Sequence, residues 1–139
     1  MNAYTAYKQA SAMAMTRIDL LLALYDGAIE RIAVAINCLR EGKTNEATPY
    51  LARAQLIVAA IASGVRPQVH QEIGVSTLRL CEYVAYQISQ STPDGLASAL
   101  TVLNSLRQGF EKIRPEAAQL ERTGQIPPGD KINGVQAVA

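Results

Sequence analysis

The sequence predicts an all-α fold, an antiparallel four-helix bundle with an N-terminal docking arm and a flexible C-terminal tail. Three observations predict it: apolar residues recur at alternating steps of three and four, few prolines and glycines interrupt that repeat, and 49% of the 139 residues are hydrophobic. A chain of this length can build one compact domain around a continuous core. We expect the arm over residues 1–15, the bundle over 16–114, and a short helical extension with a mobile tail over 115–139.

The clearest apolar repeat predicts a first helix that begins after Thr16 and stops at Gly42. Thr16 can cap the first turn together with Asp19 three positions later, and a glycine directly after the repeat is typical of a helix end. Gly27 lies inside the repeat, where glycine costs about 1 kcal/mol relative to alanine. The repeat consists of Ile18, Leu22, Tyr25, Ile29, Ile32, Ile36 and Leu39.

The second and third helices are predicted over about 44–63 and 72–89. Pro49 is expected in the first turn of the second helix, where a missing amide hydrogen costs no intrahelical bond. Both helices carry apolar residues on two adjacent lines, which indicates either a surface for a partner or a core that absorbs the extra side chains. The two lines of the third helix are Ile73, Leu80 and Val84, and Leu78, Cys81, Ala85 and Ile88.

The fourth helix has a strong predicted start at Thr92, Pro93 and Asp94. Thr92 can cap it, proline suits the first helical position, and an acidic side chain is favourable near the amide end. Pro115 is expected to end or kink this helix, with two short turns over 116–122. The glycines and prolines that follow predict the mobile tail.

Composition argues against several classes of function. Thirteen Lys and Arg against twelve Asp and Glu leave a net charge of +1, so no basic surface is predicted for nucleic acid. The longest apolar runs, 20–25 and 56–62, are far below the ~20 residues of a membrane span. Cys38 and Cys81 lack CxxC spacing and are expected to be buried, reduced thiols, which suits the cytoplasm.

Catalytic residues, metal ligands and cofactors are not predicted. His70 is the single histidine, so a two-histidine metal site cannot form. His70 followed by Gly74 resembles the site of histidine phosphotransfer domains, which are also helical bundles. Those domains place a lysine just before the glycine, whereas this chain has Ile73, and we disfavour this alternative.

Several short motifs resemble those of one protein family in order and spacing. The leader MNAYTAY precedes LLLALYDGAI in the first helix, and AQLI, LCEYV and LRQGF follow in the next three helices. Together they resemble the flagellar export chaperones of the FliS family over residues 2–113. The chain departs from the family pattern at Cys81, where an aromatic residue is usual, and at Phe110, where many members have tryptophan.

The resemblance implies a non-enzymatic, cytosolic secretion chaperone for flagellin. The terminal segments of flagellin are disordered in the monomer and pack as helices in the filament, so a bundle that binds the C-terminal segment would prevent premature polymerisation and keep flagellin competent for export. Two further partners are left open, namely an export-gate component and a second copy of this chain. A structural or oligomer-forming bundle is the alternative function.

The expected partner-binding residues come from the arm and from the second apolar lines. The paired tyrosines of the arm would cover the empty groove and leave when the client arrives. We expect the others to be surplus to a minimal core, although each can equally belong to it. The expected residues are Tyr4, Tyr7, Ile57, Ile61, Leu80, Val84 and Leu103.

Overall fold

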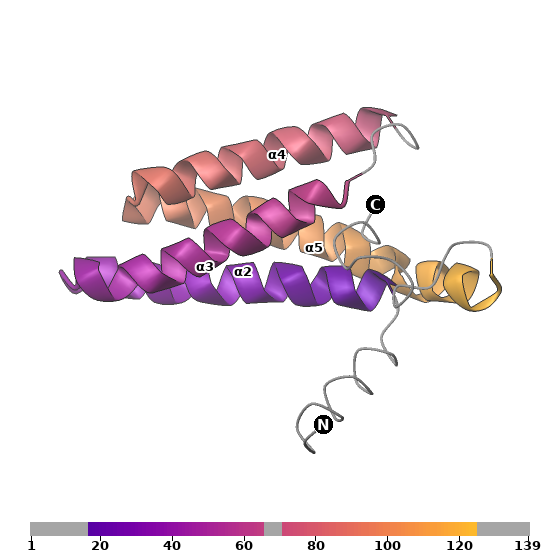
Figure 1. Cartoon of the computed structure of the whole chain (residues 1–139), viewed down its shortest axis with the longest axis horizontal. Coiled ribbons are helices and arrows are strands. Elements are labelled where there is room, and N and C mark those ends of the chain that lie inside the picture. The colour runs from indigo at the N-terminus through magenta and orange to yellow at the C-terminus, as the bar shows by residue number, and fades with distance from the viewer. Residues whose placement is uncertain (1–16, 66–70, 125–139) are drawn as a thin grey trace, which may run out of the picture.

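A computed structural model describes residues 17–65 and 71–124, and within them the chain forms four helices and no strand. The helices are α2 (Arg17–Arg40), α3 (Thr44–Ser63), α4 (Gln71–Gln90) and α5 (Pro93–Arg122). Consecutive helices run in opposite directions along the same long axis (Figure 1). The predicted all-α, four-helix fold is confirmed, while the arm and the tail lie outside the described residues.

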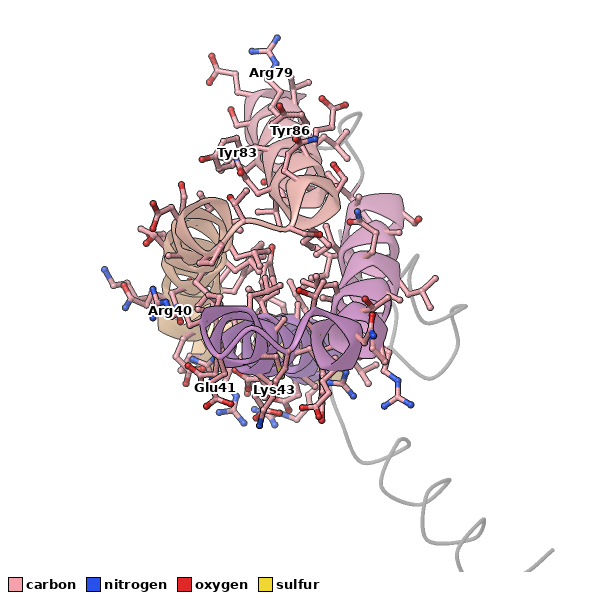
Figure 2. The ribbon with its side chains drawn as sticks, turned by 90° about the vertical axis from the view of Figure 1, so that its left-hand side faces the viewer. Arg40, Glu41, Lys43, Arg79, Tyr83 and Tyr86 are labelled. Atoms are coloured by element: carbon pink, nitrogen blue, oxygen red, sulfur yellow. The ribbon has the colours of Figure 1, made fainter. Side chains whose placement is uncertain are left out.

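The four helices stand at the corners of a square. α2 packs against α3 and α5, and α4 packs against the same two helices on the opposite side. Seen along the bundle, α4 lies farthest from α2 (Figure 2). Tyr25 of α2 is fully buried and stacks on Phe110 of α5, with 5.8 Å between ring centroids. α2 is therefore the helix around which the core is built.

The turn between α2 and α3 confirms Gly42 as the end of the first helix. Gly42 has a φ of +76°, a backbone conformation that favours glycine. The Lys43 amide donates to the Cys38 carbonyl at 2.8 Å and the Gly42 amide to the Leu39 carbonyl at 3.1 Å, which is the Schellman pattern.

Pro49 lies in the second turn of α3, so its predicted place in the first turn was wrong. The Lys43 carbonyl already accepts from the amides of Glu46 and Ala47, which starts the helix at Thr44. Ala47 is fully buried and holds this early turn against the core. Pro49 removes one bond to the Asn45 carbonyl, and because both residues are exposed, water can replace that bond.

α4 buries one line of side chains rather than the two that were predicted. Its core-facing line is Thr77, Cys81, Val84 and Ile88. Leu80, expected on a buried line with Val84, is 37% exposed because it lies about 40° further round the helix, at the bundle edge. The side chain of Ile73 lies outside the described residues.

α5 begins as predicted. Pro115 was expected to end or kink it, and the end is excluded because the residues after Pro115, where short turns were expected, continue the same helix to Arg122. The Thr92 hydroxyl accepts a hydrogen bond from the Gly95 amide at 3.1 Å, which is the expected cap. The helix continues to Arg122 because its last turns are held against α2. Arg114 pairs with Asp19 at 2.7 Å.

The end of α5 also caps the start of α2. The carboxylate of Glu121 accepts a hydrogen bond from the Arg17 amide at 2.9 Å, across 104 positions of sequence. Glu121 is buried, and its charge lies at the positive end of the α2 dipole. The predicted cap Thr16 lies outside the described residues.

Candidate partner-binding surface

Large apolar side chains are exposed at several places on the described bundle. α4 carries three of them on its outer side, and Figure 2 shows Tyr83 and Tyr86 there together with Arg79. Tyrosine and arginine are the side chains most enriched where proteins bind one another. The exposed set is Val34, Tyr50, Leu56, Leu80, Tyr83, Tyr86 and Ile113.

Two contacts fix the antiparallel register between α4 and α5. The hydroxyls of Tyr83 and Ser98 are 2.6 Å apart. Nearer the connecting turn, Gln87 covers Gly95 so closely that a Cβ there would lie 2.2 Å from the amide oxygen of Gln87. Leu80 lies one turn before Tyr83 on α4 and therefore faces residues 101–102 of α5.

An apolar strip follows this α4–α5 boundary away from the turn. On α5, steps of four and three from Ser98 keep the side that faces α4. Val102 and Leu106 are half-buried against the core, and Ile113 at the end is 47% exposed. We call this surface the α4–α5 strip, and it consists of Leu80, Tyr83, Val102, Leu106 and Ile113.

A glycine lies in the middle of the strip. Gly109 falls between Leu106 and Ile113 on this side of α5, and among the described residues no atom comes within 4 Å of the place where its Cβ would be.

The α2–α5 boundary, by contrast, is closed by charged pairs. Arg107 of α5 binds the carboxylate of Asp26 on α2, and this hydrogen bond raises the pKa of Arg107. Arg114 and Asp19 form a second such pair toward the end of α5. A helix from another molecule would have to break these pairs to enter at this boundary.

The structure does not bring the sequence-predicted residues into one surface. Three of them are fully buried in the core, namely Ile61, Val84 and Leu103. Ile57 is half-buried against α2, with its Cδ1 3.3 Å from the Cβ position of Gly27. Leu80 lies on the strip, and Tyr4 and Tyr7 lie outside the described residues.

Sequence reasoning missed four residues of the strip, namely Tyr83, Val102, Leu106 and Ile113. A signal for them was present. Tyr83 follows Leu80 by three positions, and the residues on α5 are spaced by four or seven, so each group shares one helix face.

The core beneath α4 contains two unpaired polar atoms. Gln55 of α3 donates to the Ala85 carbonyl of α4 at 3.0 Å, but its buried side-chain oxygen has no partner among the described residues. The Tyr25 hydroxyl is also buried and unpaired there. A buried group left without a partner costs about 1–3 kcal/mol.

The same buried region shifts the pKa values of two acidic side chains. Burial raises the pKa of the Cys81 thiol to about 11. The pKa of Tyr25 is also raised, first by burial and then by the nearby Cys81. Both groups are therefore neutral near pH 7.

A second, more polar surface lies between α2 and α3. Val34 and Tyr50 form part of an open depression of about 200 Å³, whose other lining residues are Glu30, Arg31 and Arg53. The guanidinium of Arg31 donates to the Gly27 carbonyl at 3.0 Å and is held on its own helix. The α4–α5 strip is the more apolar surface.

Metal sites and membrane spans are absent from the described part of the chain. No cluster of three or more His, Cys, Asp or Glu within residues 17–65 and 71–124 could hold a metal ion. No helix in those ranges has the length and hydropathy needed to cross a membrane.

Comparison with known proteins gives one result. The family model described as flagellar protein FliS matches residues 1–117 of the chain. The match covers all of α2, α3 and α4 and most of α5, including every residue of the strip. Searches of curated proteins and of solved structures gave no match.

Proposed function

The chain belongs to the flagellar protein FliS family, a family of flagellar export chaperones, and from this premise we propose that it binds the C-terminal segment of flagellin. Binding keeps flagellin from polymerising early and leaves it competent for export. The bundle does this in the cytoplasm, without catalysis, by covering apolar side chains that would otherwise associate.

The observation that carries this proposal is the α4–α5 strip. A strip between two antiparallel helices fits the apolar face of an amphipathic helix, which is the helix-in-groove mode of recognition. Each 100 Å² of apolar surface covered contributes about 2.5 kcal/mol, before the cost of ordering the client. A client that is disordered when free pays that cost on binding, so it is held reversibly.

Leu80 and Tyr83 are the proposed centre of the surface. They are 37% and 38% exposed, so each keeps enough free area to be covered by a client. Leu80 is also one of the residues expected from the sequence. The paired Tyr83 hydroxyl keeps its hydrogen bond to Ser98 while its ring packs on the client.

The N-terminal arm is proposed to cover this apolar surface in the absence of client. Tyr4 and Tyr7 are aromatic side chains three positions apart in a leader that is otherwise polar or small. Deleting residues 1–10 should therefore increase binding of a dye that reports exposed apolar surface. Unchanged dye binding by the truncated chain, with the same helical content, would count against this role.

The function is tested by co-purification with a flagellin C-terminal fragment and a mass measurement of the product. A one-to-one complex is expected. An oligomer of this chain whose mass is indifferent to the fragment would support the alternative, in which the strip joins copies of the bundle.

A further inference from the structure

A depression at the α2–α3 boundary lies on the side of the bundle opposite the α4–α5 strip. α2 contacts α3 and α5, and α4 contacts the same two helices, so these two boundaries are opposite sides of the square (Figure 2). The depression is open and has a volume of about 200 Å³. Its lining residues are Glu30, Arg31, Val34, Tyr50 and Arg53. None of them belongs to the strip, so the proposed client site gives this surface no role.

The register between α2 and α3 brings the two halves of the depression together. Ile57 of α3 meets Gly27 of α2, where its Cδ1 is 3.3 Å from the Cβ position of the glycine. In antiparallel helices, residues equally far from such a contact in opposite sequence directions come to the same level. Val34, seven residues after Gly27, therefore lies level with Tyr50, seven residues before Ile57. One turn nearer the contact, the two arginines lie level with each other.

The end of the depression at Val34 and Tyr50 is apolar. Each of these side chains is 38% exposed, so both keep area that a partner can cover. Tyrosine is among the side chains most enriched where proteins bind one another, because its rigid ring buries a large area at a small cost in conformational entropy. An aromatic or aliphatic side chain of a partner fits at this end.

The other end of the depression is positively charged. Arg53 is exposed and forms no ion pair or hydrogen bond with any described residue. The guanidinium of Arg31 is held by its hydrogen bond to the Gly27 carbonyl at 3.0 Å, which leaves it further N–H donors. Because these two positive charges meet a single carboxylate in the lining, that of Glu30, the depression attracts an anion.

We propose that this α2–α3 depression is a second protein-binding site, which takes a partner segment where an aromatic or aliphatic side chain lies next to a carboxylate. The apolar side chain packs between Val34 and Tyr50. The carboxylate pairs with Arg53, whose planar guanidinium can bind both carboxylate oxygens. Recognition of an acidic motif through arginines is a recurring mode of peptide binding.

The remaining segments of this chain do not have the chemistry of the occupant. Residues 1–16 contain Lys8 and no aspartate or glutamate, so they offer aromatic rings without a carboxylate. Residues 125–139 contain one acidic residue, Asp130, which Lys131 follows directly. The occupant is therefore an acidic segment of another protein. Since the depression and the strip lie on opposite sides of the bundle, this segment binds without covering the strip.

The chain has no tryptophan, which allows a direct binding test. The probe is a short peptide with one central tryptophan flanked by glutamates, and its fluorescence anisotropy reports binding to the full chain at low salt. A peptide with glutamines in place of the glutamates is the comparison. We expect the acidic peptide to bind about tenfold more tightly, with a difference that shrinks as salt is added. Equal affinity for the two peptides, or binding of neither, would overturn the proposal.

Arg53→Glu tests the location of the site, with Arg79→Glu as the matched control. Arg79 is exposed on the outer side of α4 beside Tyr83 and Tyr86, so the control makes the same charge change near similar side chains (Figure 2). We expect Arg53→Glu to weaken binding of the acidic peptide about tenfold and Arg79→Glu less than about twofold. Tyr50→Ala should weaken it about fivefold by removing the ring. Equal loss in the two arginine variants would show attraction by charge alone and would overturn the site.

The flagellin C-terminal fragment tests whether the depression is separate from the client site. Arg53→Glu should change the affinity for this fragment less than about twofold, because Arg53 lies across the bundle from the strip. A loss as large as that for the acidic peptide would make the depression part of the client site and would overturn a separate partner. A fragment that does not bind the parent chain would refute the proposed client, while the peptide comparison still decides whether the depression takes an acidic segment.

Discussion

The hydroxyl of Tyr25 lies in the core without a hydrogen-bond partner among the described residues. Its ring is fully buried and stacks on Phe110, but the hydroxyl has no partner within the described residues. Tyr25→Phe removes the unpaired atom and keeps the ring, so the free energy of unfolding should rise by about 1 kcal/mol. Urea unfolding measures this change.

The control for Tyr25 is Tyr83→Phe, which removes a hydroxyl that is paired with Ser98 at the surface. Its effect should be within about 0.5 kcal/mol, as for most surface substitutions. A loss of stability for Tyr25→Phe would show that the buried hydroxyl is satisfied after all.

Cys81 makes stability depend on pH in the alkaline range. Burial raises the thiol pKa from its usual 9.0 to about 11, so the folded state binds a proton that the unfolded state releases. Well below pH 9 the thiol is protonated in both states and has no effect. Between pH 9 and 11 stability falls, at up to about 1.4 kcal/mol per pH unit from this group.

The measurement is urea unfolding at several pH values, with Cys81→Ala as the comparison. Tyr25, whose pKa is raised mainly by burial, remains in both chains and lowers stability above pH 10 in each, slightly more in the parent, where Cys81 adds to the rise. The parent chain should lose more stability than Cys81→Ala from pH 9 to 11. Parallel curves would show that the folded thiol titrates normally.

At the scale of the helix, the end of α5 holds the start of α2. Glu121→Ala removes a buried carboxylate that accepts from the Arg17 amide, and should lower the free energy of unfolding by about 1 kcal/mol, a typical effect of losing a cap. Glu116→Ala is the matched control, since Glu116 is exposed on the same stretch of α5. Equal effects in urea unfolding would contradict the capping role of Glu121.

Local signals explain which helix boundaries sequence could predict. Gly42 and Thr92 act through their own backbone and side chain, so their roles were predicted correctly. The effects of Pro49 and Pro115 on their helices were also predicted from local rules, but tertiary contacts determine whether the helix continues past each proline. Buried Ala47 and the pairing of Arg114 with Asp19 hold helical turns around these prolines.

The orientation of a helix about its own axis is harder to predict from the sequence than where the helix begins and ends. Leu80 and Val84 are both apolar and only about 40° apart on α4, yet Val84 is fully buried and Leu80 lies at the edge. Neighbouring helices fix this difference, since Tyr83 meets Ser98 and Gln55 meets Ala85. From the sequence, core residues and surface residues were therefore predicted together, because nothing local distinguishes them.

For the whole molecule, accessibility divides the residues expected from sequence into a surface group and a core group. Leu80 and Ile113 are exposed, whereas Ile61 and Leu103 are fully buried. A bundle that encloses its core and exposes an apolar strip at a helix boundary can remain folded alone and still offer that surface to a partner.

Calorimetric titration of a flagellin C-terminal fragment into Leu80→Glu, with Leu56→Glu as control, tests the central claim most directly. Leu56 is 72% exposed but lies on α3, away from the strip, so the two variants make the same chemical change in different places. We expect Leu80→Glu to weaken binding at least tenfold and Leu56→Glu less than twofold, with both chains folded. Unchanged affinity for Leu80→Glu, or equal loss in both, would contradict a client site on the α4–α5 strip.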